Sequence, residues 1–465
     1  MADERFGDAV TIAVRYFMAA VAEGHKNTPE LREQILDSIL KLRIGPLNPY
    51  EGLDRDALRS ELERRFNIVI EPPKILEGKG EHRAWLLERK AEGTVDWTLW
   101  EEYRRILLDV ALRPPPVVAD LDHTTDDVLG RLEDPQDLDR TWDRRGMVVG
   151  QVQSGKTGHY AGLICKALDA GYKVVIVLAG PYNNLRSQVQ RRLDEELLHF
   201  DTSRPDAQPF ADGGVGGIAG GTRIIPLTSQ LEDGDFKAQV ATTVSIGPGH
   251  SPILLVVKKN ARVLSTLLRF FATGPGARPE SGRRRNVISG APLLVIDDEA
   301  DYGSVNTADV PLDESGEFVQ DYNPTRINQL VRELLRTFQQ SAYVGYTATP
   351  FANIFIHPDQ PHEFFGDDLF PESFIISLQT PSDYFGPALV FGLGGADSEP
   401  LPLVEYVDDY HTFVPDGHRN GYQPPGLCPS VREAIRMFIL TCAVRRVRGQ
   451  RNVHNSMLIH VTRFV

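Results

Sequence analysis

The segment that most limits how this chain can fold is residues 150–157, which spell GQVQSGKT and match the pattern G-x-x-x-x-G-K-[ST] in full. A short apolar run, 147–149, precedes it, and a segment with helical character, 160–170, follows it. A strand, a glycine-rich loop and a helix in this order point backbone N–H groups and a helix N-terminus at bound phosphates. The spacing predicts that Lys156 reaches the β- and γ-phosphates of ATP and that the Thr157 hydroxyl holds Mg²⁺. The residues expected to bind the nucleotide are Gly150, Gln153, Ser154, Gly155, Lys156 and Thr157.

Strand-length apolar runs alternate with helical segments from about residue 140 onward. Such runs are typical of parallel strands buried on both faces, and the helices between them predict an α/β fold with a doubly wound parallel sheet. The runs are 147–149, 173–178, 223–227, 253–257, 293–296 and 342–346.

On either side of this region the sequence patterns predict other kinds of structure. Residues 1–115 are expected to form a helical N-terminal domain, which a proline run separates from an α/β domain over 116–357. A turn-rich insertion over 358–430 is expected to leave the sheet. In the last part, 431–465, the pattern predicts a helix over 431–447 and a further buried strand over 456–462.

An acidic turn follows the apolar run 292–296 and spells Asp297, Asp298, Glu299, Ala300 and Asp301. Carboxylates at the carboxyl end of a central parallel strand face a nucleotide bound at the same edge of the sheet. The last four residues of the turn form the sequence DEAD. We expect Asp298 to hold Mg²⁺ through water and Glu299 to polarise the attacking water, although the adjacent Asp297 leaves this register open by one residue.

A third motif, TATP over 347–350, follows the predicted strand 342–346. A Thr-Ala-Thr turn downstream of a DEAD sequence resembles motif III of superfamily 2 helicases. That resemblance implies that the hydroxyls of Thr347 and Thr349 link the hydrolysis site to the path of the nucleic acid. Taken alone, the turn would be a capping turn closed by Pro350; the order of the three motifs favours the helicase interpretation.

Polar side chains follow two other predicted strands and are candidates for DNA contacts. The helix that starts near Asn183 occupies the place of motif Ia, which grips the DNA backbone in that class. The candidates for phosphate contact are Asn184, Arg186, Gln188 and Lys258, and the alternative is that they are solvated positions at the starts of helices. The net charge of −14 excludes a histone-like binder that is basic all over, but it leaves room for a local basic groove.

Several stretches together resemble one bacterial family, the Z-one domain proteins, which carry an endonuclease label. The resemblance runs over essentially the whole chain after about residue 95 and is most specific in GQVQSGKT (150–157) and GYTATPFAN (345–353). Further matching stretches are 125–135, 170–192, 256–264, 294–301, 370–384 and 456–463. Members are superfamily 2 helicase-like ATPases of restriction-modification and anti-phage operons, often beside MORC- or MutL-like ATPases, methylases and nucleases.

The resemblance implies a RecA-like first lobe over 116–357 and the start of a second lobe, the region of the Z-one name, over 431–465. In the family SMLIHVTR opens this second lobe, but here the sequence stops at Val465 with no later arginine-finger motif. We therefore expect a truncated protein, or one half of a split protein, that binds ATP and Mg²⁺ but hydrolyses slowly. An arginine finger from a second lobe contributes about 10³–10⁵ in rate.

The leading hypothesis is a DNA-dependent ATPase that translocates on or remodels double-stranded DNA within a bacterial defence system. One alternative is an ATP-dependent endonuclease component. The sequence shows no His-Asn-His arrangement and no His cluster at metal-ligand spacing, so cleavage would have to come from elsewhere. The other alternative is a nucleotide-gated scaffold for a nuclease or MORC-like partner.

The sequence also indicates the cellular compartment of the protein. No run of eighteen apolar residues is present, the N-terminus has no signal-peptide pattern, and three distant cysteines fit a reducing compartment. These features predict a cytoplasmic protein without a membrane partner.

Overall fold

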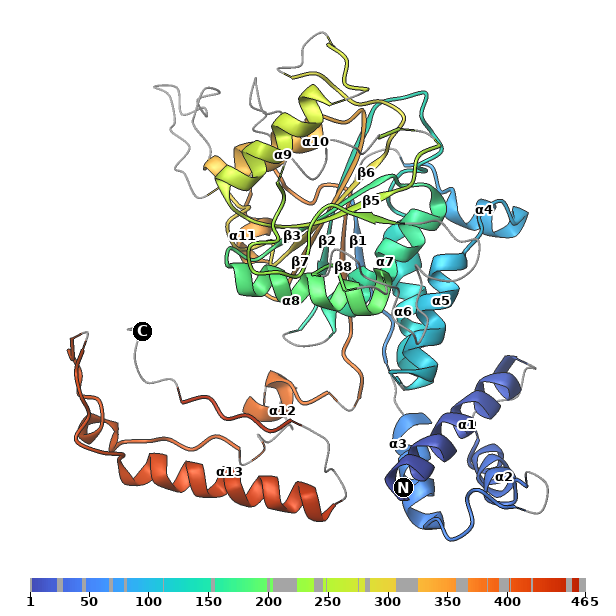
Figure 1. Ribbon diagram of the computed structural model, residues 1–465, viewed down its shortest axis with the longest axis vertical. Helices are drawn as coiled ribbons and strands as arrows, with labels where there is room; N and C mark the ends of the chain where they lie inside the picture. The colour runs from blue at the N-terminus through green and yellow to red at the C-terminus, as the bar shows by residue number, and fades with distance from the viewer. Residues whose placement is uncertain are drawn as a thin grey trace. The chain divides into compact units, whose positions relative to one another are not determined.

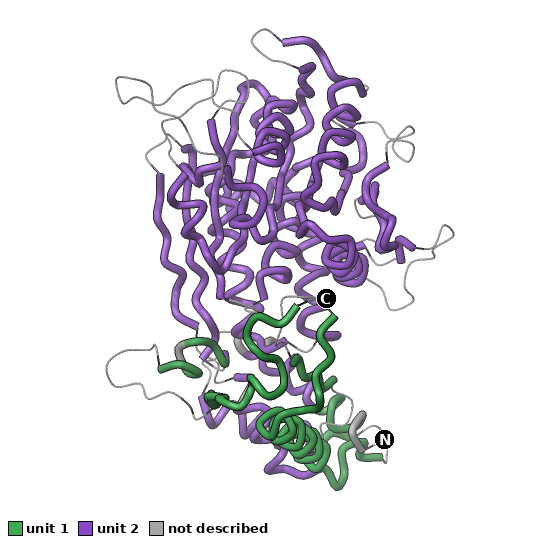
Figure 2. The backbone as a smooth tube through the Cα atoms, turned by 90° about the vertical axis from the view of Figure 1, so that its left-hand side faces the viewer, with its two compact units in different colours: residues 1–9, 42–53, 385–465 green, residues 10–41, 54–384 purple. Residues whose placement is uncertain are grey.

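The computed structural model describes most of the chain. The described residues are 2–22, 28–43, 47–66, 70–78, 82–111, 113–151, 155–198, 201–203, 224–237, 246–247, 249–274, 276–280, 285–306, 325–356, 367–382, 384–392, 401, 403–419, 421–448 and 454–459. They fall into two compact units, one made of 1–9, 42–53 and 385–465 and the other of 10–41 and 54–384 (Figure 2). The domain boundaries predicted from the sequence stay a prediction.

The described residues form 13 α-helices and eight strands (Figure 1). The helices are α1 (Ala2–Ala22), α2 (Pro29–Leu40), α3 (Arg55–Phe66), α4 (Leu86–Glu92), α5 (Thr98–Asp109), α6 (Pro115–Leu129), α7 (Lys156–Ala170), α8 (Asn183–Leu193), α9 (Ala261–Thr273), α10 (Arg326–Arg336), α11 (Phe351–Ile354), α12 (Pro387–Phe391) and α13 (Pro429–Val447). The strands are β1 (Lys74–Glu77), β2 (Trp142–Val149), β3 (Val174–Ala179), β4 (Ile225–Pro226), β5 (Ile253–Lys258), β6 (Leu293–Asp298), β7 (Gln340–Thr347) and β8 (Phe374–Ser377).

All eight strands belong to one sheet with the order β1-β8-β2-β7-β6-β3-β5-β4. Every neighbouring pair is parallel except β1 with β8. The prediction of an α/β fold with a mostly parallel sheet is therefore confirmed.

The two faces of the sheet are covered by different helices, because successive strand residues point to opposite faces. On β3, Val175 and Val177 belong to the apolar cluster that includes α5, α6 and α7. Val174 and Ile176 belong to a second cluster, on the other face, that includes α9 and α10. This alternation is why the sequence shows β3 as a continuous apolar run: both sets of side chains are buried.

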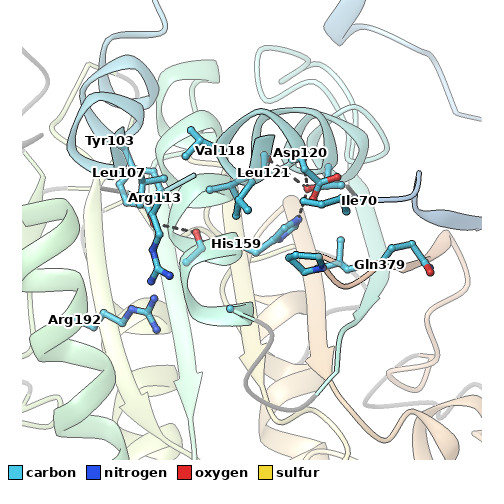
Figure 3. A pocket seen from close by; sticks show the side chains of 16 residues that line it. Ile70, Tyr103, Leu107, Arg113, Val118, Asp120, Leu121, His159, Arg192 and Gln379 are labelled. Carbon is cyan, nitrogen blue, oxygen red and sulfur yellow. Dashed lines mark hydrogen bonds between the residues drawn. The ribbon is translucent and has the colours of Figure 1, made fainter. Parts of the chain in front are cut away.

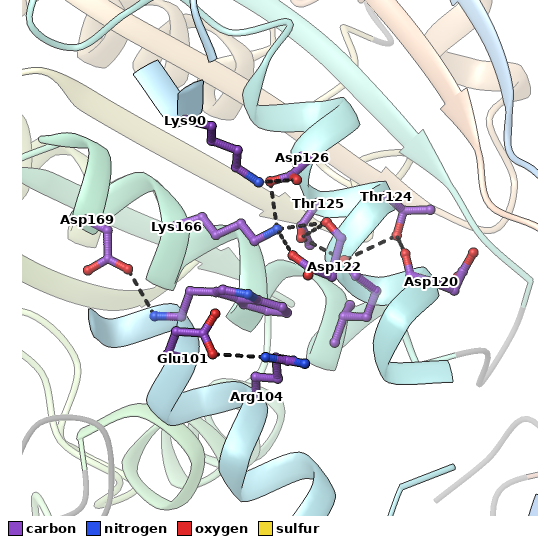
Figure 4. Close-up of polar contacts among 12 residues, drawn as sticks. Lys90, Glu101, Arg104, Asp120, Asp122, Thr124, Thr125, Asp126, Lys166 and Asp169 are labelled. Carbon is purple, nitrogen blue, oxygen red and sulfur yellow. Dashed lines mark hydrogen bonds and ion pairs between the residues drawn. The ribbon is translucent and has the colours of Figure 1, made fainter. Parts of the chain in front are cut away.

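A buried lysine joins α6 and α5 to α7 (Figure 4). The Lys166 side chain is fully buried, and its Nζ lies 2.5 Å from Asp122 Oδ1 and 2.7 Å from Asp126 Oδ1, both on α6. The same ammonium lies 4.3 Å from the ring centre of Trp100 on α5. Two carboxylates and an aromatic face offset the cost of burying the Lys166 charge. These contacts hold α5 and α6 beside α7.

Three expectations about the sheet are wrong. The insertion over 358–430 does not leave the sheet throughout, since β8 lies in it and pairs with β2 in parallel, whereas residues 385–430 belong to the other unit. The N-terminal region is not purely helical, because β1 forms the antiparallel edge beside β8. Residues 454–459 form no strand, and Leu458 is 85% exposed; the rest of the predicted strand 456–462 lies outside the described residues. The helix predicted over 431–447 is confirmed by α13.

The packing of β2 against β8 gives the first testable prediction. A methyl group at Gly146 of β2 would overlap the ring of Phe374 on β8, which is only 1% exposed. We expect Gly146→Ala to lower the free energy of unfolding by about 1–3 kcal/mol, because the ring has no space into which to move. The measurement is the midpoint of urea unfolding. Gly7→Ala is the matched control: it lies in α1 with open space around it and is expected to be neutral or stabilising. Equal midpoints for the two variants would contradict the packing.

Candidate active site

Three neighbouring strands bring the three sequence motifs to one edge of the sheet. The loop after β2, the turn after β7 and the acidic turn after β6 follow strands that run in parallel in the order β2-β7-β6. Backbone bonds fasten the outer two to the middle one: Gly150 N donates to Thr347 O (3.0 Å), and Ala300 N donates to Tyr346 O (3.0 Å). Since strands are about 4.8 Å apart, about 10 Å separates the loop from the acidic turn, which leaves space for a phosphate and a hydrated metal ion.

The loop and the start of α7 present positive groups at this edge. Gly155 takes a left-handed conformation (φ 95°) as the N-cap of α7, and Lys156 is the first residue of the helix. The Lys156 amine donates to the carbonyl oxygens of Gly150 and Gln151, each at 3.4 Å. The amine therefore lies over the loop, and the first turn of α7 also carries Thr157. Gln153 and Ser154 lie outside the described residues.

The two consecutive aspartates at the end of β6 face opposite sides of the sheet. Asp297 is fully buried on the α9 side, where its Oδ1 lies 2.7 Å from Lys259 Nζ and its Oδ2 accepts a 2.6 Å hydrogen bond from Tyr343. Asp298 faces α7, where its Oδ2 accepts a 3.3 Å hydrogen bond from the Tyr160 hydroxyl. The glycine-rich loop leads into α7, so the geometry favours Asp298 over Asp297 in the register that the sequence left open, and the metal-holding role of Asp298 stays a prediction.

Burial raises the pKa of Asp298, and the neighbouring negative charge of Glu299 raises it further; the charges of Lys259 and Lys156 act in the opposite direction. A bound cation would stabilise the ionised form of a carboxylate in this environment. Mg²⁺ binds one or two protein oxygens and fills its remaining positions with water and substrate phosphates. Asp298 and the Thr157 hydroxyl are the residues present that fit this requirement. Among the described residues, no group of three or more His, Cys, Asp or Glu side chains is placed to hold a metal ion.

Glu299 has a strained backbone. Its φ of 53° is the only positive value for a non-glycine residue in the described part of the chain. Such a conformation costs about 1–3 kcal/mol and persists where surrounding contacts fix it. Lys259 Nζ donates to Glu299 O (2.6 Å) and to Tyr302 O (3.0 Å), so one buried lysine holds both sides of the turn. The Glu299 side chain is exposed at this edge.

The last residue of the acidic turn is bonded to the Thr-Ala-Thr turn. Asp301 accepts hydrogen bonds from the hydroxyls of Thr347 (2.7 Å) and Thr349 (2.6 Å) through its two carboxylate oxygens. Thr349 N also donates to Thr347 Oγ1 (2.9 Å). A displacement of either turn would therefore be transmitted to the other.

The candidates for DNA contact lie in different environments. Asn184 and Gln188 are exposed on α8, and Lys258 Nζ donates to Asn183 Oδ1 at 2.7 Å. Arg186 is fully buried, and its guanidinium donates to the carbonyl oxygens of Ser229 (2.8 Å) and Leu231. Its position gives no support to the expected contact with a DNA phosphate; Arg186 instead fixes the segment that follows β4.

Sequence reasoning missed the structural role of Lys259 and the polar contacts made by His159 and Tyr160. His159 is buried, and its ring nitrogens lie 2.9 Å from Tyr346 Oη and 3.2 Å from Thr124 Oγ1. Burial, with a smaller effect of Lys166, lowers the pKa of His159 to about 3, so the ring is neutral at pH 7. The alternation of side chains along strands could have identified Lys259. It lies two residues after Val257, and Asp297 lies two residues after Val295, so both point to the face of the sheet that α9 covers.

A family model of the Z1 domain matches residues 430–465. This stretch contains most of α13 and residues 454–459, and it lies apart in sequence from every site residue described above. A search of the curated proteins finds no match. Among the described residues, none of the helices combines the length and apolar character needed to cross a membrane.

The buried pair of Lys259 and Asp297 gives the second prediction. We expect Lys259→Met to lower the free energy of unfolding by about 3–5 kcal/mol, because it leaves the Asp297 carboxylate buried without its cation. Urea unfolding measures the loss. The double variant Lys259→Met/Asp297→Leu is expected to recover most of it, since both buried charges are then removed.

Lys237→Met is the matched control, because Lys237 forms an ion pair with Asp233 in which the two side chains are 54% and 80% exposed. We expect little change in its unfolding midpoint, since exposed ion pairs contribute little. A Lys259→Met variant as stable as this control would contradict the assigned role of Lys259.

Proposed function

We propose that this chain is an ATP- and Mg²⁺-dependent P-loop ATPase of the superfamily 2 helicase type, with a RecA-like lobe whose hydrolysis is coupled to double-stranded DNA. The observation that carries the proposal is the pair of hydrogen bonds from Thr347 and Thr349 to Asp301. Together with the backbone bond from Gly150 to Thr347, they join the glycine-rich loop, the acidic turn and the Thr-Ala-Thr turn. An ATPase that works on another molecule requires such a connection between its hydrolysis site and a second surface.

Each site residue has a role that follows from its chemistry. Lys156 and the N-terminus of α7 would neutralise the phosphates, and Thr157 and Asp298 would hold Mg²⁺. When bound, the metal supplies charge stabilisation to the phosphate oxygens. Glu299 would orient and polarise the attacking water.

A nucleic-acid partner is supported by polar groups at the same edge of the sheet. β3 and β5 neighbour β6, and their carboxyl ends lead to the exposed Asn184 and Gln188 and to Lys258. Because the chain has a net charge of −14, the proposed DNA path is confined to this local surface.

The cellular setting is also part of the proposal. The resemblance of the sequence to the Z-one family is the ground for proposing a place in a bacterial restriction-modification or anti-phage system, in the cytoplasm; the Z1 match covers residues 430–465 of the chain. A nuclease, methylase or MORC- or MutL-like ATPase would then be the protein partner.

The third prediction tests the ATPase. We expect Lys156→Ala to lower ATP turnover by on the order of 10²-fold or more and to weaken ATP binding, because it removes the phosphate-neutralising amine. Glu299→Gln should lower turnover by about 10²–10⁴-fold while ATP binding persists, because only the activation of water is lost. Turnover is measured as phosphate release with and without duplex DNA, and Lys237→Ala serves as the surface control. Full turnover in both site variants would refute the proposed site.

The fourth prediction tests the coupling. In the double variant Thr347→Val/Thr349→Val, Asp301 loses both hydroxyl donors. We expect the ratio of turnover with DNA to turnover without DNA to fall by roughly fivefold or more, a typical size for coupling between two sites. Thr273→Val is the matched control, since this hydroxyl only bonds within its own helix, to Arg269 O. An unchanged ratio would mean that the Thr-Ala-Thr turn does not couple ATP hydrolysis to DNA, and it would favour the nucleotide-gated scaffold.

A further inference from the structure

A pocket of about 130 Å³ opens beside the first turn of α7 (Figure 3). It lies between α5, α6, the start of α7 and the chain that follows β8, and Gly155 and Gly158 form part of its wall. The phosphate-site residues Lys156 and Thr157 do not line it, nor do the carboxylates of the acidic turn. The pocket therefore adjoins the phosphate loop and is placed to receive a group that is attached to bound phosphates.

The walls of the pocket are largely apolar. Leu107 and Val118 contribute from α5 and α6, Leu121 from the next turn of α6, and Pro381 from the chain after β8. Pockets for small molecules and cofactors typically combine such walls with a few polar groups that fix orientation. Apolar walls suit a flat heterocyclic ring better than they suit a sugar or a phosphate.

Two arginines line the pocket, and Figure 3 shows both guanidinium groups on the same side of it. Arg192 is fixed by Glu196, which accepts hydrogen bonds from Arg192 Nε (2.8 Å) and from the Tyr103 hydroxyl (3.0 Å). The Arg113 guanidinium makes no hydrogen bond or ion pair with another described residue. Guanidinium groups bind phosphate and hydroxyl oxygens and stack on aromatic rings, so this side suits the sugar–phosphate part of a ligand.

Asp120 lies on the other side of the pocket in Figure 3 and is the one carboxylate among the described residues that line it. Burial raises the pKa of Asp120 to about 6, while the charge of His123 acts in the opposite direction. The group is therefore mainly ionised at pH 7.5 and can only accept hydrogen bonds. A ring that carries amino N–H donors would satisfy it, whereas a ring without donors would leave the carboxylate desolvated and unpaired.

We propose that this pocket holds the nucleoside of an aminopurine nucleoside triphosphate such as ATP. The base lies between the apolar walls, Asp120 accepts a hydrogen bond from its amino group, and Arg113 and Arg192 face the sugar–phosphate side. The inference rests on the proposed function, because the triphosphate itself would occupy the loop of residues 150–157.

The test compares ligands that share the triphosphate and differ in the nucleoside. Binding of ATP, of purine riboside triphosphate (which lacks the amino group) and of inorganic tripolyphosphate to the full chain is measured by calorimetry with Mg²⁺. Leu121→Trp fills the pocket with an indole ring. We expect its dissociation constant for ATP to rise about tenfold or more, equivalent to about 1.4 kcal/mol, with that for tripolyphosphate unchanged.

Unchanged binding of tripolyphosphate also shows that the variant is folded. Leu47→Trp is the matched control, since Leu47 is 71% exposed and does not line the pocket; it should bind all three ligands like the wild type. A second variant tests the polar contact. The wild type should bind ATP more tightly than purine riboside triphosphate, and Asp120→Ala should abolish that preference.

The outcomes separate this inference from the proposed function. If the wild type binds tripolyphosphate and ATP but Leu121→Trp weakens neither, the phosphate site stands and the assignment of the pocket is overturned. Equal affinity of the wild type for ATP and purine riboside triphosphate would overturn the role of Asp120. If the wild type binds neither ATP nor tripolyphosphate, the proposed function fails and the pocket assignment fails with it.

Discussion

The buried ion pair between Asp297 and Lys259 is the contact on which the geometry of the candidate site depends. Consecutive strand residues point to opposite faces, so the burial of Asp297 on one face turns Asp298 toward α7 on the other. Lys259 also donates to the carbonyl oxygens of Glu299 and Tyr302. A single lysine thus sets the direction of the carboxylate that faces the phosphate loop and holds the strained residue that follows it.

The sheet supplies the second constraint. The glycine-rich loop, the acidic turn and the Thr-Ala-Thr turn are separated by long stretches of sequence, yet each follows a strand of the same parallel group. The middle strand, β7, makes backbone bonds to the turns on both sides through Tyr346 and Thr347. Because these bonds are part of the main chain, the relative positions of the three turns depend little on flexible side chains. The remaining link, from Asp301 to Thr347 and Thr349, uses side chains, of which Thr347 is buried and Thr349 is exposed.

Much of this fold follows from local sequence patterns. The central strands were predictable because residues such as Val175 and Ile176 are buried on both faces, which produces an unbroken apolar run. Local patterns were less informative where a residue's partner is distant in sequence. Arg186 is a polar residue near a helix start, but its burial depends on the carbonyl oxygens of Ser229 and Leu231, more than 40 residues away. Such satisfaction of a buried charge is not visible in the sequence around it.

The short strands were missed for a related reason. β8 has four residues, and its place in the sheet is set by β2, which is more than 200 residues away. The strand expected at 456–462 was predicted from an apolar run alone, and residues 454–459 pair with no other described strand. An apolar run favours a strand only if a neighbouring edge is available for its hydrogen bonds.

The most direct measurement is a structure of the chain with Mg²⁺ and a non-hydrolysable ATP analogue. The account predicts the γ-phosphate beside Lys156 and the metal ion between Thr157 and the side of Asp298 that faces α7, with Asp297 still paired to Lys259. A nucleotide bound away from the loop of residues 150–157, or a metal ion held by Asp297, would contradict it.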